Sequence, residues 1–222
     1  MPARTTTATD AADLARALAF ARRQIRGACE RALAHPFGEA FLDTRLPRAH
    51  VLNSLHVASE VDPDQLVAAL DDLYAGYPHR RAYVEVDATG ERLASELRRR
   101  GWQVERNVVM ALRRPRDRDG DRALAREVDA ATHRAADAET VRDEPYGRDE
   151  DVVTLREHRR RGLARATLTL ALDAAIEMGH ALVFIVADAD DWPQELYARL
   201  GFDPVGHAWG FTLARRLPAT AR

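Results

Sequence analysis

The stretch REHRRRGLA, residues 156–164, places a run of arginines directly before a glycine and small apolar residues. The pattern predicts a turn between a strand that ends at Leu155 and a helix that begins near Gly162. The first turn of a helix has backbone N–H groups without partners inside the helix, and it lies at the positive end of the helix dipole. Such a turn binds anions, and small residues at Gly162 and Ala164 allow a phosphate to approach the backbone closely.

The charges around this turn conflict with the helix that follows. Arg156, Arg159, Arg160 and Arg161 stand at its positive end, where each exposed cation costs about 0.3–1 kcal/mol. A local preference that is violated without a gain in stability indicates a functional site. The residues alone leave three interpretations open: a solvated basic loop, a nucleic-acid contact, and a phosphate-binding loop. An ATP site of the Walker type is excluded because no G-K-[ST] follows.

Composition limits the remaining possibilities. The chain has 222 residues, of which 46% are hydrophobic and 31% charged, as in an ordinary globular protein. Its 33 basic and 35 acidic residues nearly cancel, so any basic site is local and nucleic acid is not an expected partner. The single cysteine, Cys29, excludes an internal disulfide and a cysteine metal cluster. We find neither a signal segment nor a membrane span, and we expect a cytoplasmic protein.

Periodicity and turn residues predict alternating helices and strands, which favours an α/β fold. In the first part of the chain, Asp62-Pro63 starts a helix, because aspartate caps and proline suits the first turn. The predicted helices there cover 11–34, 63–73 and 91–100, and the predicted strands cover 40–44, 51–58, 82–86 and 102–112.

The later part of the chain repeats this alternation. Its predicted strands cover 125–128, 152–155, 181–187 and 202–213, and its predicted helices end near residues 142, 178 and 200. The run ALVFIVA, residues 181–187, is continuously apolar, which is typical of a strand covered on both faces.

The charged segment RRPRDRDGDR, residues 113–122, contains no apolar residue except proline and reads as a linker. It predicts a first half at 1–114, a linker at 115–122 and a second half at 123–222. Residues 91–112 and 193–213 both read helix, glycine, aromatic, strand. This favours two related halves, although helix–glycine–strand is also a common unit.

The segments REHRRRGLARATLTLAL, ALVFIVADADDW and ELYARLGF resemble the GNAT superfamily of acyl-CoA-dependent N-acetyltransferases. Arg159, Gly162 and Ala164 match the family's R/Q-x-x-G-x-G/A turn, which binds the pyrophosphate of acetyl-CoA. Leu196-Tyr197 and Gly201-Phe202 match the later motifs. The resemblance covers about residues 150–213 and implies a GNAT-like mixed sheet flanked by helices, with the first half a degenerate copy that does not bind CoA.

The resemblance also implies roles for individual residues. Tyr197 occupies the position of the tyrosine that protonates the departing thiolate, although a tyrosine packed under the sheet gives the same pattern. Glu150, or Asp151, lies where a carboxylate base often stands, although both belong to a charged surface run. The backbone of Leu155 pairs with the pantetheine arm, and Asp190 replaces a common asparagine that touches the cofactor. The implied cofactor-binding turn comprises Arg159, Arg160, Arg161, Gly162, Leu163 and Ala164.

One departure from the family concerns length. Members place helices and a β-hairpin between the first strand of the domain and the strand before the turn, whereas here only residues 129–151 separate the two predicted strands. Strands from residues 40–58 fill the gap, or a second copy does so in a homodimer, or the protein is a shortened relative. We therefore expect an enzyme that moves an acetyl group from acetyl-CoA to a small-molecule primary amine. The alternative is an inactive CoA-binding or partner-binding module.

Overall fold

The computed structural model describes residues 7–126, 154 and 156–214. The chain forms two compact units. The first comprises Met1–Ala111, Phe184–Tyr197 and Phe202–Arg222, and the second comprises Leu112–Val183 and Ala198–Gly201. Two segments of the predicted second half therefore belong to the first unit. The relation between the predicted halves stays a prediction.

A mixed seven-stranded sheet is the centre of the first unit. Its strands are β1 (Arg31–His35), β2 (Gly38–Leu42), β3 (Leu55–Val57), β4 (His79–Val84), β5 (Gln103–Leu112), β6 (Phe184–Asp188) and β7 (Phe202–Ala214). They lie in the order β1-β2-β3-β4-β7-β5-β6. Strands β3 and β4 are parallel, whereas β1–β2, β2–β3, β4–β7 and β5–β6 are antiparallel. The expected mixed α/β sheet is confirmed.

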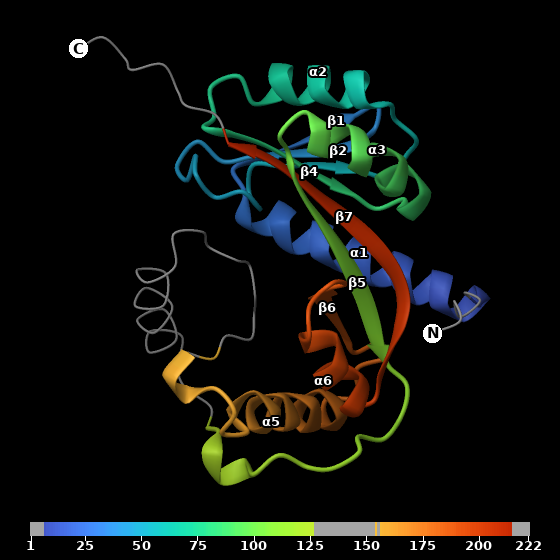
Figure 1. Cartoon of the computed structure of the whole chain (residues 1–222), viewed down its shortest axis with the longest axis vertical. Coiled ribbons are helices and arrows are strands. Elements are labelled where there is room, and N and C mark those ends of the chain that lie inside the picture. The colour runs from blue at the N-terminus through green and yellow to red at the C-terminus, as the bar shows by residue number, and fades with distance from the viewer. Residues whose placement is uncertain (1–6, 127–153, 155, 215–222) are drawn as a thin grey trace. The chain divides into compact units, whose positions relative to one another are not determined.

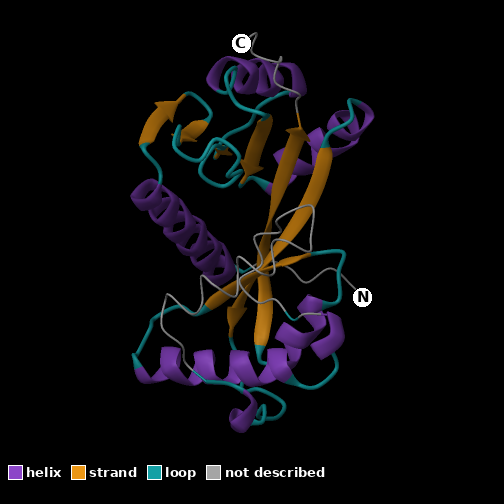
Figure 2. Cartoon of the chain, turned by 90° about the vertical axis from the view of Figure 1, so that its left-hand side faces the viewer, coloured by secondary structure: helices purple, strands orange, loops and turns teal. Residues whose placement is uncertain are grey.

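The strand order interleaves segments that are far apart in the sequence. Strand β7, the last of the described strands, lies between β4 and β5, and the long strands β5 and β7 run side by side (Figure 1; the strands are orange in Figure 2). Strand β5 also pairs with β6, with Val109 opposite Val186. Among the described residues, strands β2 and β3 pair with β1, β4 and each other. The strands from residues 40–58 therefore belong to the same sheet as β6 and β7, but β5 is the strand that lies beside β6.

Helices cover both faces of this sheet. They are α1 (Ala8–Ala28), α2 (Pro63–Leu73) and α3 (Asp87–Arg99). A Cβ atom on Gly206 would meet Leu14 of α1, and a Cβ atom on Gly90 of α3 would meet the ring of Trp209. Because residues 206 and 209 are an odd number of positions apart on β7, α1 and α3 lie on opposite faces.

The hydrophobic core lies between the sheet and helices α2 and α3. The two helices contribute leucines that are at most 1% exposed, and the strands contribute aromatic and branched side chains. Members of this core are Leu55, Val57, Leu66, Leu70, Val84, Leu93, Leu97, Trp209 and Phe211. Burial of each such side chain stabilises the fold by about 1.5–3 kcal/mol, so this face holds the first unit together.

The second unit is built around helix α5 (Leu163–Glu177). Two short 3-10 helices, η1 (Arg122–Leu124) and η2 (Arg156–His158), precede it. Helix α6 (Pro193–Arg199) follows β6 and belongs to the first unit up to Tyr197. None of the helices in the described ranges is long and apolar enough to cross a membrane.

The predicted N-terminal helix is wrong at its end. Helix α1 stops at Ala28, and residues 31–35 form β1 rather than a further helical turn. The reason is long-range, because Arg31–His35 pairs in register with Gly38–Leu42 as a hairpin. The helical propensity of alanine at 32 and 34 yields to this pairing.

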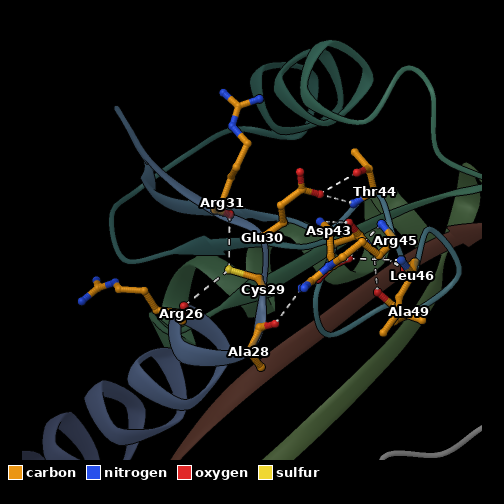
Figure 3. A network of polar contacts seen from close by, with 11 residues as sticks. Arg26, Ala28, Cys29, Glu30, Arg31, Asp43, Thr44, Arg45, Leu46 and Ala49 are labelled. Atoms are coloured by element: carbon orange, nitrogen blue, oxygen red, sulfur yellow. Dashed lines mark hydrogen bonds and ion pairs between the residues drawn. The ribbon is translucent and has the colours of Figure 1, made fainter.

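The strand predicted at 51–58 is shorter than expected. Only Leu55–Val57 is extended, because polar side chains hold residues 43–54 as a loop (Figure 3). Asn53 Oδ1 accepts a hydrogen bond from the Asp43 amide at 2.7 Å, and Asp43 Oδ1 accepts from the amides of Arg45 and Leu46. The Arg45 guanidinium holds the pKa of Asp43 below its usual value. Such local side-chain bonds compete with strand pairing.

The strand predictions for residues 181–187 and 125–128 also differ from the structure. Strand β6 ends the sheet among the described residues, and Val186 is 42% exposed, so a strand covered on both faces is wrong at this residue. Ala125 and Arg126 are in no strand. The remainder of the strand predicted at 125–128, the helix ending near 142 and most of the strand at 152–155 lie outside the described residues.

Candidate functional site

The arginine–glycine turn, residues 156–164, has the form that the sequence predicts. Helix η2 leads through Arg159–Arg161 to Gly162, which is the N-cap of α5. Gly162 adopts φ 82°, a left-handed conformation that favours glycine, and a Cβ atom there would meet nothing within 4 Å. Glycine is therefore required by backbone conformation rather than by crowding, and the space above the turn is open.

The first turn of α5 has no side-chain cap. Its first helical hydrogen bond runs from the Ala166 amide to the Gly162 carbonyl at 2.9 Å. The amides of Leu163, Ala164 and Arg165 precede this bond and have no acceptor within the helix. These amides, at the positive end of a 15-residue helix, form a cradle for an anion.

The arginines of the turn are exposed to solvent. Arg159 Nε donates to the Thr154 carbonyl at 3.0 Å, and Arg161 Nη1 lies 3.4 Å from His158 Nδ1. Arg160 has φ 63°, a strained conformation for a residue with a side chain. Within the described ranges, no carboxylate pairs with Arg159, Arg160 or Arg161. Backbone strain and positive charge that no described carboxylate neutralises thus coincide at the N-terminus of α5.

Tyr197 and Asp190 lie in the first unit, on the segment that follows β6. Tyr197 is in α6 and is 8% exposed, with its ring centroid 6.4 Å from that of Phe202 in an edge-to-face arrangement. Asp190 is exposed, and its amide donates to Asp188 Oδ1 at 2.8 Å. Glu150, Asp151 and Leu155 lie outside the described residues. The residues of the turn, Arg159 to Ala164, therefore lie in the second unit, whereas Tyr197 and Asp190 lie in the first unit.

Residues 110–202 match the family model described as the acetyltransferase (GNAT) family. Residues 110–202 are thus similar to a GNAT acetyltransferase domain. Two solved structures have the same fold. A conserved protein of unknown function from Staphylococcus epidermidis is 13% identical, with a TM-score of 0.57 over 84% of this chain and 94% of the other. A GCN5-related N-acetyltransferase from Kribbella flavida is 19% identical, with a TM-score of 0.55 over 88% and 94%. No curated protein matches the sequence.

Helices α2 and α5 differ at their N-termini: α2 has a side-chain cap, whereas α5 has none. Helix α2 follows the parallel strand β3, but its N-terminus is closed by its own residues: the Asp62 carboxylate accepts from the Gln65 amide at 2.9 Å, and Gln65 reciprocates. Pro63 brings no N–H at all. An anion there would have to displace a carboxylate, whereas α5 begins with a glycine and has no side-chain cap to displace.

Sequence reasoning missed one residue pair within residues 110–202. Arg165, in the first turn of α5, is 8% exposed and donates from Nη1 to Asp117 Oδ1 at 2.6 Å. The Arg165 guanidinium lowers the pKa of the Asp117 carboxyl. No local signal points to this pair, because its members are separated by 48 positions and Asp117 belongs to a charged run with many candidate partners.

Proposed function

We propose that this protein transfers an acetyl group from acetyl-CoA to a primary amine. The observation that carries the proposal is the first turn of α5, which has no side-chain cap, with Gly162 in a left-handed conformation and exposed arginines beside it that pair with no carboxylate among the described residues. A diphosphate supplies the negative charge and the acceptor oxygens that this turn lacks. The GNAT family match over residues 110–202 supports the choice of a CoA thioester as the donor.

In this proposal, the residues of the turn bind the diphosphate of CoA. The amides of Gly162, Leu163 and Ala164 donate hydrogen bonds to its oxygens, and Arg159, Arg160 and Arg161 attract it over a longer range. The backbone of Leu155 pairs with the pantetheine arm. Asp190 stands near the cofactor, where its carboxylate accepts hydrogen bonds but cannot donate one as an asparagine would.

The reaction needs a neutral amine and a protonated leaving group. We assign to Glu150 the role of accepting a proton from the acceptor ammonium. The amine nitrogen then attacks the thioester carbon, the new C–N bond forms, the C–S bond breaks, and the nitrogen releases its second proton to solvent to give the neutral amide. Tyr197 donates its phenolic proton to the CoA thiolate and regains a proton from solvent.

Calorimetry with CoA and a thiol-release assay with acetyl-CoA and a panel of primary amines test the proposal. We expect CoA binding by the wild type, release of thiol with at least one amine, and loss of binding in Gly162→Glu, because the new carboxylate repels the diphosphate. Gly179→Glu is the matched control: Gly179 lies at the other end of α5, has φ 70°, and has equally open surroundings.

The outcomes separate the alternatives. Equal CoA binding by Gly162→Glu and Gly179→Glu contradicts the assignment of the turn. CoA binding that depends on Gly162 but gives no turnover with any amine favours a non-catalytic CoA-binding module.

A further inference from the structure

The segment between the predicted halves is bound along helix α5. We call residues 116–122 the brace. The Gly120 amide donates to Thr169 Oγ1 at 2.9 Å, and Arg116 Nη1 pairs with Asp173 Oδ1 at 2.8 Å. Arg122 also pairs with Asp173. The segment that reads as a linker in the sequence thus contacts three successive turns of the helix.

The brace also contacts the first turn of α5. Arg165 Nη1 donates both to Asp117 Oδ1 at 2.6 Å and to the Arg118 carbonyl at 3.1 Å. Asp117 is itself anchored, because its amide donates to the Arg199 carbonyl at 2.8 Å. The Asp117 carboxylate is therefore held from two sides, by its own backbone and by the guanidinium.

This contact compensates for two weaknesses of the helix start. The first turn has no side-chain cap, and uncapped turns open more readily than the middle of a helix. Arg165 adds a nearly buried cation at the positive end of the dipole, which is unfavourable without a counter-charge. Asp117 supplies that counter-charge and ties the turn to the brace.

We infer that Asp117 is a positioning residue for CoA: through Arg165 it holds the first turn of α5 in the conformation that receives the diphosphate. The inference depends on the proposed function, since it concerns the same turn. It also separates Arg165 from the exposed arginines. Arg165 is committed to Asp117, and the exposed arginines before Gly162 remain for the ligand.

The test measures CoA binding by calorimetry and the kinetics of acetyl transfer in Asp117→Asn, Asp117→Glu and Arg165→Gln. We expect Asp117→Asn and Arg165→Gln to raise the Kd for CoA and the KM for acetyl-CoA by roughly five- to tenfold, the effect of losing a helix cap, with kcat within about twofold. Amide hydrogen exchange at residues 163–165 accelerates in the same variants. Asp117→Glu keeps the carboxylate and binds CoA within about threefold of the wild type.

Asp173→Asn is the matched control, because it removes the ion pairs of the brace with Arg116 and Arg122, away from the first turn. We expect it to lower the melting temperature and leave the Kd for CoA unchanged. Wild-type Kd values in both Asp117→Asn and Arg165→Gln overturn the inference, and so does an equal rise of Kd in Asp173→Asn. If Asp117→Asn does not fold, Arg165→Gln decides, because it removes the buried cation together with the link. A wild type that does not bind CoA contradicts the proposed function itself.

Discussion

Gly120 lies directly against the backbone of Ala166 in helix α5. A Cβ atom on Gly120 would stand 2.7 Å from both the Cα and the backbone nitrogen of Ala166, closer than such atoms approach in real proteins. Backbone atoms of a helix cannot move aside as a flexible side chain can. The absence of a side chain at residue 120 is therefore what lets the brace reach Thr169 and bring Asp117 to Arg165.

Gly120→Ala is expected to lower the free energy of unfolding by about 1–3 kcal/mol, because the added methyl group overpacks a tight contact. Equilibrium unfolding in urea measures the change. Gly27→Ala is the control: Gly27 lies inside α1 with nothing within 4 Å, and alanine there raises stability by up to about 1 kcal/mol. A neutral Gly120→Ala contradicts the close packing of the brace.

Arg160→Gly separates backbone strain from charge in the arginine–glycine turn. Because Arg160 has φ 63°, glycine there relieves strain and raises the free energy of unfolding by about 0.5–1 kcal/mol. Loss of the charge weakens CoA binding and makes that binding less sensitive to salt. The measurements are urea unfolding and calorimetry at two salt concentrations.

The neighbour Arg161 provides the comparison. Within the described residues, Arg160 alone among the non-glycine residues has a positive φ, so Arg161→Gly removes a charge without relieving this strain. We expect it to weaken CoA binding to a similar extent and to lower stability. The same gain of stability in both variants would count against strain at Arg160.

The sequence predicts the elements of this protein whose boundaries are set by neighbouring residues. Asp62-Pro63 starts α2 as expected, since a carboxylate cap and a proline act on the residues beside them. Gly162 likewise starts α5 with an uncapped turn, because glycine tolerates φ 82°. The existence of the other described helices and most of the strands follows from periodicity in the same way.

Features made by distant pairing could not be predicted. Residues 31–35 form a strand because β2 pairs with them, although their alanines suit a helix. The insertion of β7 between β4 and β5 joins residues such as Tyr83 and Gly210, which no local pattern relates. At the candidate site, the unfavourable position of the arginines at the positive end of a helix predicts the turn from sequence. The pairing of Arg165 with Asp117 is known only from the contact in the structure.

Tyr197→Phe tests the proposed acid. The substitution keeps the ring against Phe202 and removes the phenolic proton, so we expect kcat to fall by roughly a hundredfold or more while the KM for acetyl-CoA stays within about twofold. Steady-state kinetics of acetyl transfer measure both constants. A wild-type kcat in Tyr197→Phe would mean that Tyr197 is not the general acid.

Tyr74→Phe is the control for the loss of a buried hydroxyl. Tyr74 Oη donates to the Phe41 carbonyl at 3.1 Å in the core of the first unit. Removing this bond is expected to lower the free energy of unfolding by about 1 kcal/mol and leave kcat unchanged. The two variants together distinguish a chemical role from a packing role.

Stability is expected to decline in mildly acidic solution because of His79. Its side chain is buried, and its Nε2 lies 3.1 Å from the Asn53 carbonyl. Burial lowers the pKa of His79 to about 4, with the neighbouring His50 adding to the effect. The unfolded chain then binds the proton more tightly than the folded protein. Stability is therefore full above about pH 6.5 and declines by up to about 3 kcal/mol as the pH falls to about 4.

Urea unfolding between pH 4.5 and 7.5 measures this slope. The buried carboxylates Asp43 and Glu85 have lowered pKa values. Their contribution to the free energy of unfolding is therefore lost only below about pH 4.5, so the change of stability between pH 4.5 and 7.5 comes from histidine. We expect His79→Gln to reduce the slope, with a remainder from His207, whose pKa burial also lowers. An unchanged slope in His79→Gln means that the buried imidazole is not the group that titrates.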